Sequence, residues 1–263
     1  MYTEINGINL HYKIDGPSGA PWITLSHSLA ANTEMWQWQM ETLRKYRVLR
    51  FDTRGHGQSD ATPGPYRLEQ LADDLFTLLN ALGIEKTHYV GLSMGGMIGQ
   101  IAAVKDQSRF QSLVLCDTSS AIPAEMQKLW QDRIGSAQKN GMEPLVQPTI
   151  DRWFSGIYQN KKPEDVDKIR AMIRSTTVDG FCGCCHAISK LNITKELSTI
   201  KLPTLLIVGE DDPGTPVSAH EIIQKQIRGS VLKVLPKALH FSNVEQSKLF
   251  NLTLSEFLYS LIK

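Results

Sequence analysis

The chain has little net charge and no long apolar run, and these deficits exclude several classes of partner. Its 28 lysines and arginines nearly balance its 27 aspartates and glutamates. This leaves no basic surface for nucleic acid and no polybasic segment for an anionic membrane. Apolar residues nowhere run together for the roughly 18 positions of a membrane span, and the N-terminus lacks a secretion signal. We therefore expect a soluble, cytoplasmic protein, compatible with a homo-oligomer, whose partner is a small molecule.

Cysteines are scarce and crowded. Three of the four fall in the segment Cys182-Gly183-Cys184-Cys185, which His186 follows directly. A disulfide framework is typical of much shorter secreted chains, and a zinc site needs separated pairs of cysteines and histidines. We therefore predict buried apolar thiols, no metal and no cofactor.

Repeats, linkers and low-complexity tracts are also absent, and strand and helix patterns alternate instead. Apolar runs typical of strands occupy residues 2–5, 8–14, 22–26, 47–51, 89–92, 112–117, 203–208 and 231–235. Asn6-Gly7 predicts a hairpin between the first two runs. Leucines at helical spacing predict a helix over residues 67–82, and the last helix is expected over 244–261. The alternation predicts a mostly parallel eight-stranded sheet flanked by helices.

The alternation stops between residues 121 and 197. This stretch has helical patterns and no strand-like run. We predict that it is a helical cap, inserted into an α/β core made of residues 1–120 and 198–263.

The segment Gly91-Leu92-Ser93-Met94-Gly95 matches the G-x-S-x-G pattern of a nucleophile elbow. In such an elbow a serine occupies a sharp turn between a strand and a helix, and the flanking glycines let backbones approach closely. Read alone, the pentapeptide also fits an ordinary turn.

Two downstream residues favour the catalytic interpretation. Asp212 and His240 each follow a predicted strand, as Ser93 does, and ligands of open α/β sheets bind at the carboxyl ends of the strands. The order serine, acid, histidine is that of α/β-hydrolases. Asp212 is preferred as the acid because it adjoins the turn at Pro213-Gly214. Its rivals are the neighbouring Asp211 and Glu210, and the strand-terminal Asp117.

The three residue types suit acyl transfer. A serine hydroxyl is a weak nucleophile at neutral pH, so an imidazole must take its proton during attack and return it to the leaving group. A buried carboxylate fixes the imidazole tautomer and stabilises the imidazolium. The negative oxygen needs two backbone N–H donors, one from the residue after the nucleophile and one from the loop after an early strand. We expect these to be Met94 and Leu29, with Ser28 as the alternative to Leu29.

The other histidines carry no chemistry in this interpretation. His11 falls on the polar face of its strand and is expected to be solvated. Turn or surface positions are sufficient to explain the others, which are His56, His88, His186 and His220. His27 is less easily dismissed than these, because it lies in the loop assigned to the oxyanion hole.

Several segments resemble known families. Residues 52–57 (DTRGHG), 91–96 (GLSMGG) and 209–216 (GEDDPGTP) resemble the α/β-hydrolase superfamily, and the resemblance covers nearly the whole chain. Narrower segments resemble the 3-oxoadipate enol-lactonases: Ser28-Leu29, Met35-Trp36, Arg152-Trp153-Phe154, Gly183-Cys184-Cys185 and HFSNVEQ at 240–246. The chain departs from that family at His27, Ala30 and His186, where asparagine, glycine and a small residue are more usual.

The resemblance implies a serine hydrolase that opens 3-oxoadipate enol-lactone through an acyl-enzyme. Its substrate carries a carboxylate, so Arg133 or Arg152 in the cap could bind it, although both also fit solvated helix faces. Ser28, Trp130 and Trp153 are further candidates to line the pocket, and the tryptophans could instead only join cap to core. The same triad fits a carboxylesterase or another lactonase, such as an acyl-homoserine lactonase. A non-catalytic receptor for a small ligand is an alternative of a different class.

Overall fold

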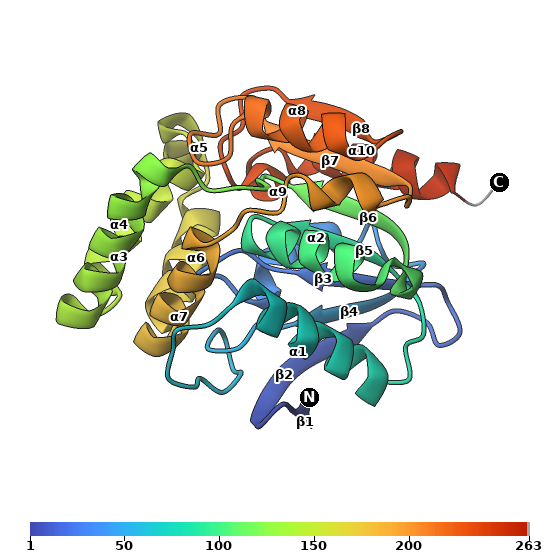
Figure 1. Ribbon diagram of the computed structural model, residues 1–263. Coiled ribbons are helices and arrows are strands. Elements are labelled where there is room, and N and C mark those ends of the chain that lie inside the picture. The colour runs from blue at the N-terminus through green and yellow to red at the C-terminus, as the bar shows by residue number, and fades with distance from the viewer. Residues whose placement is uncertain (262–263) are drawn as a thin grey trace.

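Eight strands form one sheet in the computed structural model, which describes residues 1–261 (Figure 1). The strands are β1 (Tyr2–Ile5), β2 (Ile8–Asp15), β3 (Trp22–Ser26), β4 (Arg47–Phe51), β5 (Thr87–Leu92), β6 (Phe110–Cys116), β7 (Thr204–Gly209) and β8 (Val231–Leu235). Their spatial order is β1-β2-β4-β3-β5-β6-β7-β8. β2 pairs antiparallel with β1 and β4, and all other neighbours are parallel. The predicted mostly parallel eight-stranded sheet is confirmed.

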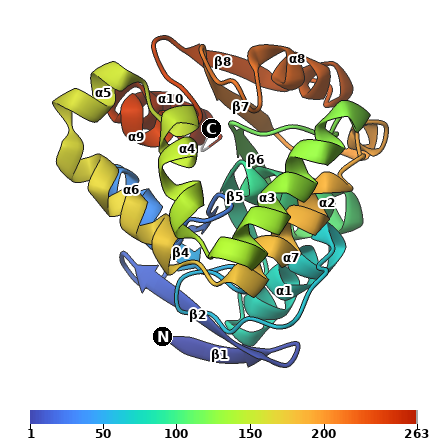
Figure 2. The ribbon, with the colours of Figure 1, turned by 90° about the vertical axis from the view of Figure 1, so that its left-hand side faces the viewer.

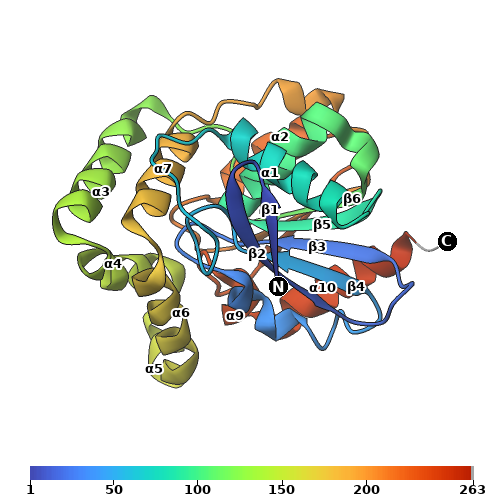
Figure 3. The same cartoon turned by 90° about the horizontal axis from the view of Figure 1, so that it is seen from below.

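Helices cover both faces of the sheet. α1 (Leu68–Ala81) and α2 (Met94–Asp106) lie on one face, and α10 (Ser247–Ser260) lies on the other (Figure 3). Since both faces are covered, every residue of β5 and β7 is buried, which is why these strands read as continuous apolar runs. α8 (Val217–Gln226) packs against β7 and β8.

Two local expectations are wrong. The last helix is interrupted, with α9 (Ser242–Glu245) ending before α10 begins at Ser247. His11 is buried, with only 4% of its surface exposed, because the loop after β4 covers β2. Its Nδ1 lies 2.8 Å from Asp52 Oδ2, and its backbone N–H donates to Ser59 Oγ.

Between β6 and β7 the chain forms helices only. They are η3 (Ala124–Met126), α3 (Gln127–Asn140), α4 (Glu143–Trp153), α5 (Gly156–Lys161), α6 (Pro163–Ser175), α7 (Val178–Ser189) and η4 (Glu196–Thr199). Figure 2 shows α3, α4, α6 and α7 standing side by side in front of the sheet. An isolated bridge between Ala121 and Asn192 ties the two ends of this segment together. No helix within residues 1–261 is long and apolar enough to cross a membrane.

Helix α7 approaches the loop after β4 so closely that each of the two segments needs glycine at the point of contact. A Cβ added to Gly180 would lie 2.1 Å from the carbonyl oxygen of Gly55, and one added to Gly55 would lie 2.2 Å from Gly180 Cα. Gly55 also has φ of +75°, which disfavours other residues. Thr177 Oγ1 donates to the Gly55 carbonyl at 2.8 Å. This contact fixes one side of the helical segment to the core.

The cysteines of α7 are buried thiols, as predicted. All four cysteines of the chain are free and buried. Burial raises the pKa of the Cys184 and Cys185 thiols, which keeps them protonated and unreactive at neutral pH.

Candidate active site

Ser93 occupies a strained turn between β5 and α2. Its φ of +55° and ψ of −114° lie outside the regions that L-residues prefer. The flanking glycines permit the turn, because a Cβ on Gly91 would lie 2.3 Å from the Gly95 carbonyl oxygen. A Cβ on Gly95 would lie 2.2 Å from the carbonyl oxygen of Ser26 in β3. The geometry is that of a nucleophile elbow.

Hydrogen bonds from β6 and the loop after it hold the elbow. The Ser93 N–H donates to the Cys116 carbonyl at 2.8 Å, and Thr118 Oγ1 donates to the Ser93 carbonyl at 2.8 Å. The side chain of Ser93 therefore stands at the N-terminus of α2, where the helix dipole favours negative charge.

Asp212 and His240 form a buried pair. Asp212 Oδ2 accepts a hydrogen bond from His240 Nδ1 at 2.7 Å and another from Thr215 Oγ1 at 2.6 Å. The other carboxylate oxygen, Oδ1, accepts from the N–H groups of Gly214 and Thr215. Asp212 is 3% exposed and His240 is 8% exposed.

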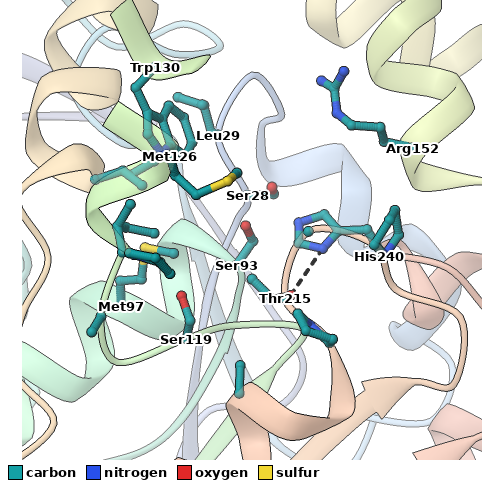
Figure 4. A pocket seen from close by; sticks show the side chains of 18 of the residues that line it. Ser28, Leu29, Ser93, Met97, Ser119, Met126, Trp130, Arg152, Thr215 and His240 are labelled. Atoms are coloured by element: carbon teal, nitrogen blue, oxygen red, sulfur yellow. Dashed lines mark hydrogen bonds between the residues drawn. The ribbon is translucent and has the colours of Figure 1, made fainter. Parts of the chain in front are cut away.

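The pair keeps Asp212 ionised. Burial alone would raise the pKa of Asp212, but the adjacent His240 and the hydrogen bonds from Thr215 outweigh it and hold this pKa below its ordinary range. Because Nδ1 donates to the carboxylate, Nε2 of His240 is left to act as a base. Figure 4 shows the His240 ring and the Ser93 hydroxyl facing the same cavity. No hydrogen bond joins these two residues, both of which the structure describes; catalytic contacts are often long without substrate.

The rival acids lie elsewhere. Asp211 and Glu210 are exposed. Asp117 is buried, but its carboxylate accepts hydrogen bonds from Gly209 N–H and Ser242 Oγ, whereas His240 Nδ1 donates to Asp212. Burial, together with the nearby Asp212 carboxylate, raises the pKa of Asp117 well above its ordinary value.

Two backbone amides are available for an oxyanion. No acceptor for the N–H of Leu29 or Met94 is found among residues 1–261. The N–H of Ser28 is engaged, because it donates to Met35 Sδ at 3.3 Å, and this favours Leu29 over Ser28. Ala30 follows with φ of +57°, a left-handed conformation that suits the glycine more usual at this position.

His27 is the first residue of this loop after β3, and sequence reasoning gave it no defined role. The Thr53 N–H donates to His27 Nε2 at 2.8 Å, so Nε2 carries no proton. Nδ1 must then carry it and donate to the Ser28 carbonyl at 2.7 Å. Burial lowers the pKa of His27, which favours this neutral tautomer.

Three histidines assigned to turns or surfaces are in fact buried. His56 and His220 are fully enclosed, and His88 is 7% exposed. Burial lowers the pKa of His56 to about 3 and that of His220 to about 4, so both are neutral at pH 7. His220 Nε2 accepts a hydrogen bond from Thr118 N–H, which is a structural role. His186 is half-buried.

A cavity of about 460 Å³ opens above Ser93, between the core and the helical segment. This is large enough for a small organic ligand. Every candidate substrate-binding residue lines it: Ser28, Trp130, Arg133, Arg152 and Trp153. Trp153 also stacks on Phe241 with ring centroids 4.0 Å apart, so it joins the helical segment to the core as well.

Neither Arg133 nor Arg152 forms an ion pair with a carboxylate within residues 1–261, although the charge of Asp151 acts on Arg152. Arg133 lies over the Trp130 ring, 4.7 Å from its centroid, and Arg152 donates to Thr149 Oγ1. Burial and the neighbouring Arg133 lower the pKa of Arg152 to about 10, so it stays charged at pH 7. Two unpaired, mutually repelling cations favour an anionic ligand.

Comparison with known proteins identifies the family. A model described as the alpha/beta hydrolase fold matches residues 21–247. The chain belongs to the α/β hydrolase fold family. Among curated relatives of this α/β hydrolase, 3-oxoadipate enol-lactonase 1 of Acinetobacter baylyi is 35% identical over 99% of this chain and 97% of that protein. Enol-lactonase 2 of the same organism is 36% identical over 93% of this chain and 91% of that protein.

Solved structures agree. The crystal structure of the enol-lactonase from Burkholderia xenovorans LB400 matches this α/β hydrolase with a TM-score of 0.95 and 36% identity, covering 98% of this chain and 100% of that one. The predicted fold and the predicted family are therefore confirmed.

Proposed function

We propose that this α/β hydrolase cleaves carboxylic esters by acyl transfer through Ser93, His240 and Asp212. The observation that carries the proposal is the 2.7 Å hydrogen bond from His240 to Asp212, at the cavity that Ser93 also faces. The amides of Leu29 and Met94 are the proposed oxyanion donors. Residues 121–197 are proposed to act as the cap over a core of residues 1–120 and 198–263. Cytoplasmic location and a homo-oligomer stay predictions of the sequence.

The proposed substrate is 3-oxoadipate enol-lactone. Two curated relatives and one solved structure carry the name enol-lactonase. The unpaired Arg133 and Arg152 in the wall of the cavity suit a substrate with a carboxylate. Trp130, Trp153 and Ser28 would contact the ring and its substituent.

The reaction follows from these positions. His240 takes the Ser93 proton as the hydroxyl attacks the ring carbonyl, and the N–H groups of Leu29 and Met94 stabilise the oxyanion. Collapse expels the ring oxygen as an enolate, which leaves easily and becomes a ketone on protonation. His240 then activates water, which hydrolyses the acyl-enzyme and releases 3-oxoadipate.

A fluorophosphonate probe tests the nucleophile. We expect one covalent adduct per chain, lost in Ser93→Ala. Ser119→Ala is the matched control, because Ser119 also lines the cavity and its loss should leave the adduct in place. A non-catalytic receptor would give no adduct with the wild-type protein, and that result would refute the mechanism.

Substrate identity needs a separate comparison. The kcat/KM for 3-oxoadipate enol-lactone is measured against aryl acetates and saturated lactones. We expect the enol-lactone to be preferred, because only it offers both a carboxylate and an enolate leaving group. An aryl ester preferred by orders of magnitude would leave the hydrolase assignment intact and favour a carboxylesterase.

A further inference from the structure

The backbone around the catalytic histidine is held on both sides of that residue. We call residues 239–241 the histidine loop. The Leu239 N–H, just before His240, donates a hydrogen bond to Glu245 Oε2 at 2.9 Å. The Phe241 N–H, just after it, donates to the Trp153 carbonyl at 3.1 Å. Glu245 lies in α9 and Trp153 ends α4, so one bond comes from the core and the other from the helical segment.

Glu245 also reaches the helical segment, because α9 lies next to α4 and α5 (Figure 2). Its second carboxylate oxygen, Oε1, accepts hydrogen bonds from the Ser155 N–H at 3.0 Å and from Ser155 Oγ. Ser155 is the N-cap of α5, and its hydroxyl accepts from the Tyr158 N–H. The half-buried Glu245 side chain therefore joins the histidine loop to the turn between α4 and α5.

Aromatic rings pack beside these hydrogen bonds. Phe241 is fully buried, and its ring stacks on Trp153 with the centroids 4.0 Å apart. Phe154 meets the Phe241 ring edge-on, with the centroids 5.6 Å apart. The apolar surroundings strengthen the neighbouring hydrogen bonds, because the local dielectric constant is low. Residues 153–155 and the histidine loop thus contact each other through side chains and backbone.

The position of the His240 ring depends on this backbone support. The hydrogen bond to Asp212 fixes Nδ1, whereas Nε2 must reach the hydroxyl of Ser93. How far Nε2 reaches depends on where the histidine loop lies. A displacement of about 1 Å at a catalytic group can cost about 100-fold in rate. A group that fixes the loop can therefore control the reaction without touching the substrate.

We propose that Glu245 is a positioning residue, whose carboxylate links Ser155 of the helical segment to the histidine loop and so places His240. Glu245 itself is not among the residues that line the cavity. α4 precedes Ser155 and carries Arg152, so the same link sets the distance between the catalytic base and the arginine proposed to bind the substrate carboxylate. The inference rests on the proposed triad mechanism.

Glu245→Gln tests the link with almost no change in shape. A glutamine amide has one accepting oxygen, so it cannot accept from both Leu239 and Ser155. We expect kcat for a neutral aryl acetate to fall about 10-fold with KM changed less than twofold, and the rate constant of fluorophosphonate labelling to fall by a similar factor. The adduct should still reach one per chain, because this yield counts folded protein. An unchanged labelling rate constant, whatever the yield, overturns the proposal.

Two substitutions of Ser155 separate the link from helix capping. Ser155→Ala removes both the hydroxyl donor and the N-cap of α5, whereas Ser155→Asp still caps the helix but places a second carboxylate beside Glu245. We expect Ser155→Asp to lower kcat at least threefold, and at least as much as Ser155→Ala does. Wild-type kcat in Ser155→Asp would overturn the proposal. Ser175→Ala is the matched control, because the Ser175 hydroxyl donates to the Met172 carbonyl within α6, and kcat should not change.

A double variant and the nucleophile variant complete the test. Glu245→Gln and Ser155→Ala break the same link, so in the double variant their losses of kcat should not multiply. Losses that multiply would show independent effects and overturn the link. Failure of the triad mechanism gives a different result, in which the wild-type protein forms no adduct or Ser93→Ala keeps full activity.

Discussion

The side chain of His27 donates a hydrogen bond to the backbone carbonyl of Ser28, at 2.7 Å. In a trans peptide the carbonyl and the following N–H point in opposite directions. Holding the Ser28 carbonyl therefore orients the N–H of Leu29 away from His27. Since Thr53 N–H fixes the other ring nitrogen, the imidazole acts as a rigid link between the β4 loop and the proposed oxyanion hole.

His27→Leu should lower kcat by about 10- to 100-fold, with KM changed less than threefold, because an oxyanion donor acts mainly in the transition state. Steady-state kinetics on the enol-lactone or an aryl acetate would measure this. His88→Leu serves as the control, since His88 is another buried histidine and its ring contacts Ser112, far from the elbow serine in the sheet. An equal loss of kcat in both variants would indicate general destabilisation.

Asp117→Asn and Asp212→Asn should differ in activity. Loss of the carboxylate that orients a catalytic histidine costs about 10³- to 10⁴-fold in kcat. We expect such a loss for Asp212→Asn, and a change under threefold for Asp117→Asn, because Asp117 does not contact His240. The reverse result would move the catalytic acid to the end of β6.

Stability should also depend on pH through Asp117. Its pKa is raised above the ordinary 3.8, so the folded protein keeps a proton that the unfolded chain releases as pH rises above about 4. Wild-type stability therefore decreases with rising pH in this window, and Asp117→Asn lacks that loss. Urea unfolding would measure the free energy of unfolding of both proteins at several pH values. The value for Asp117→Asn minus that for wild type should increase from pH 4 to pH 7. A constant difference would contradict the raised pKa.

Arg152→Gln should discriminate between substrates. A hydrogen bond to a charged group contributes about 1.5–3 kcal/mol, so kcat/KM for the enol-lactone should fall about 10- to 100-fold relative to that for a neutral aryl acetate. Arg133→Gln should have a smaller effect, because the Arg133 guanidinium lies over the Trp130 ring, 4.7 Å from its centroid. Equal losses on charged and neutral substrates would mean that Arg152 does not bind the carboxylate.

Ala30→Gly should stabilise the protein by ~0.5 kcal/mol. Alanine at φ of +57° is strained by roughly 1 kcal/mol, and the greater freedom of glycine in the unfolded chain offsets part of the gain. Thermal or urea unfolding would measure it. Ala171→Gly is the contrasting control, since Ala171 is exposed inside α6 and its loss should destabilise by ~1 kcal/mol.

Residues that a short local sequence pattern identifies were predictable from the sequence. Gly91 and Gly95 mark the elbow because no other residue fits their close contacts. Asp212 was distinguished from Asp211 by the adjoining Pro213-Gly214 turn, and that turn supplies the Gly214 N–H which the carboxylate accepts. The central strands of the sheet were predictable because both of their faces are buried, which gives continuous apolar runs in the sequence.

Residues that act through distant partners were not predictable. His11 and His27 are polar residues in a strand and a loop, and only the folded chain brings His11 to Asp52 and His27 to Thr53. Thr215 had a weak local signal, because an aspartate often accepts a hydrogen bond from the N–H two residues on, as Asp212 does from Gly214, and Thr215 is the next residue. Its bond to Asp212 depends on the loop after β7.

The contact between Gly55 and Gly180 has a consequence for how substrate range can diverge in related enzymes. Any side chain larger than hydrogen at either position must displace backbone, so this side of the helical segment tolerates little change. α3 and α4 are not pinned in this way, and they carry Trp130, Arg133 and Arg152. New substrate specificities should therefore arise by substitution in α3 and α4. The contact between α7 and the loop after β4 should stay constant.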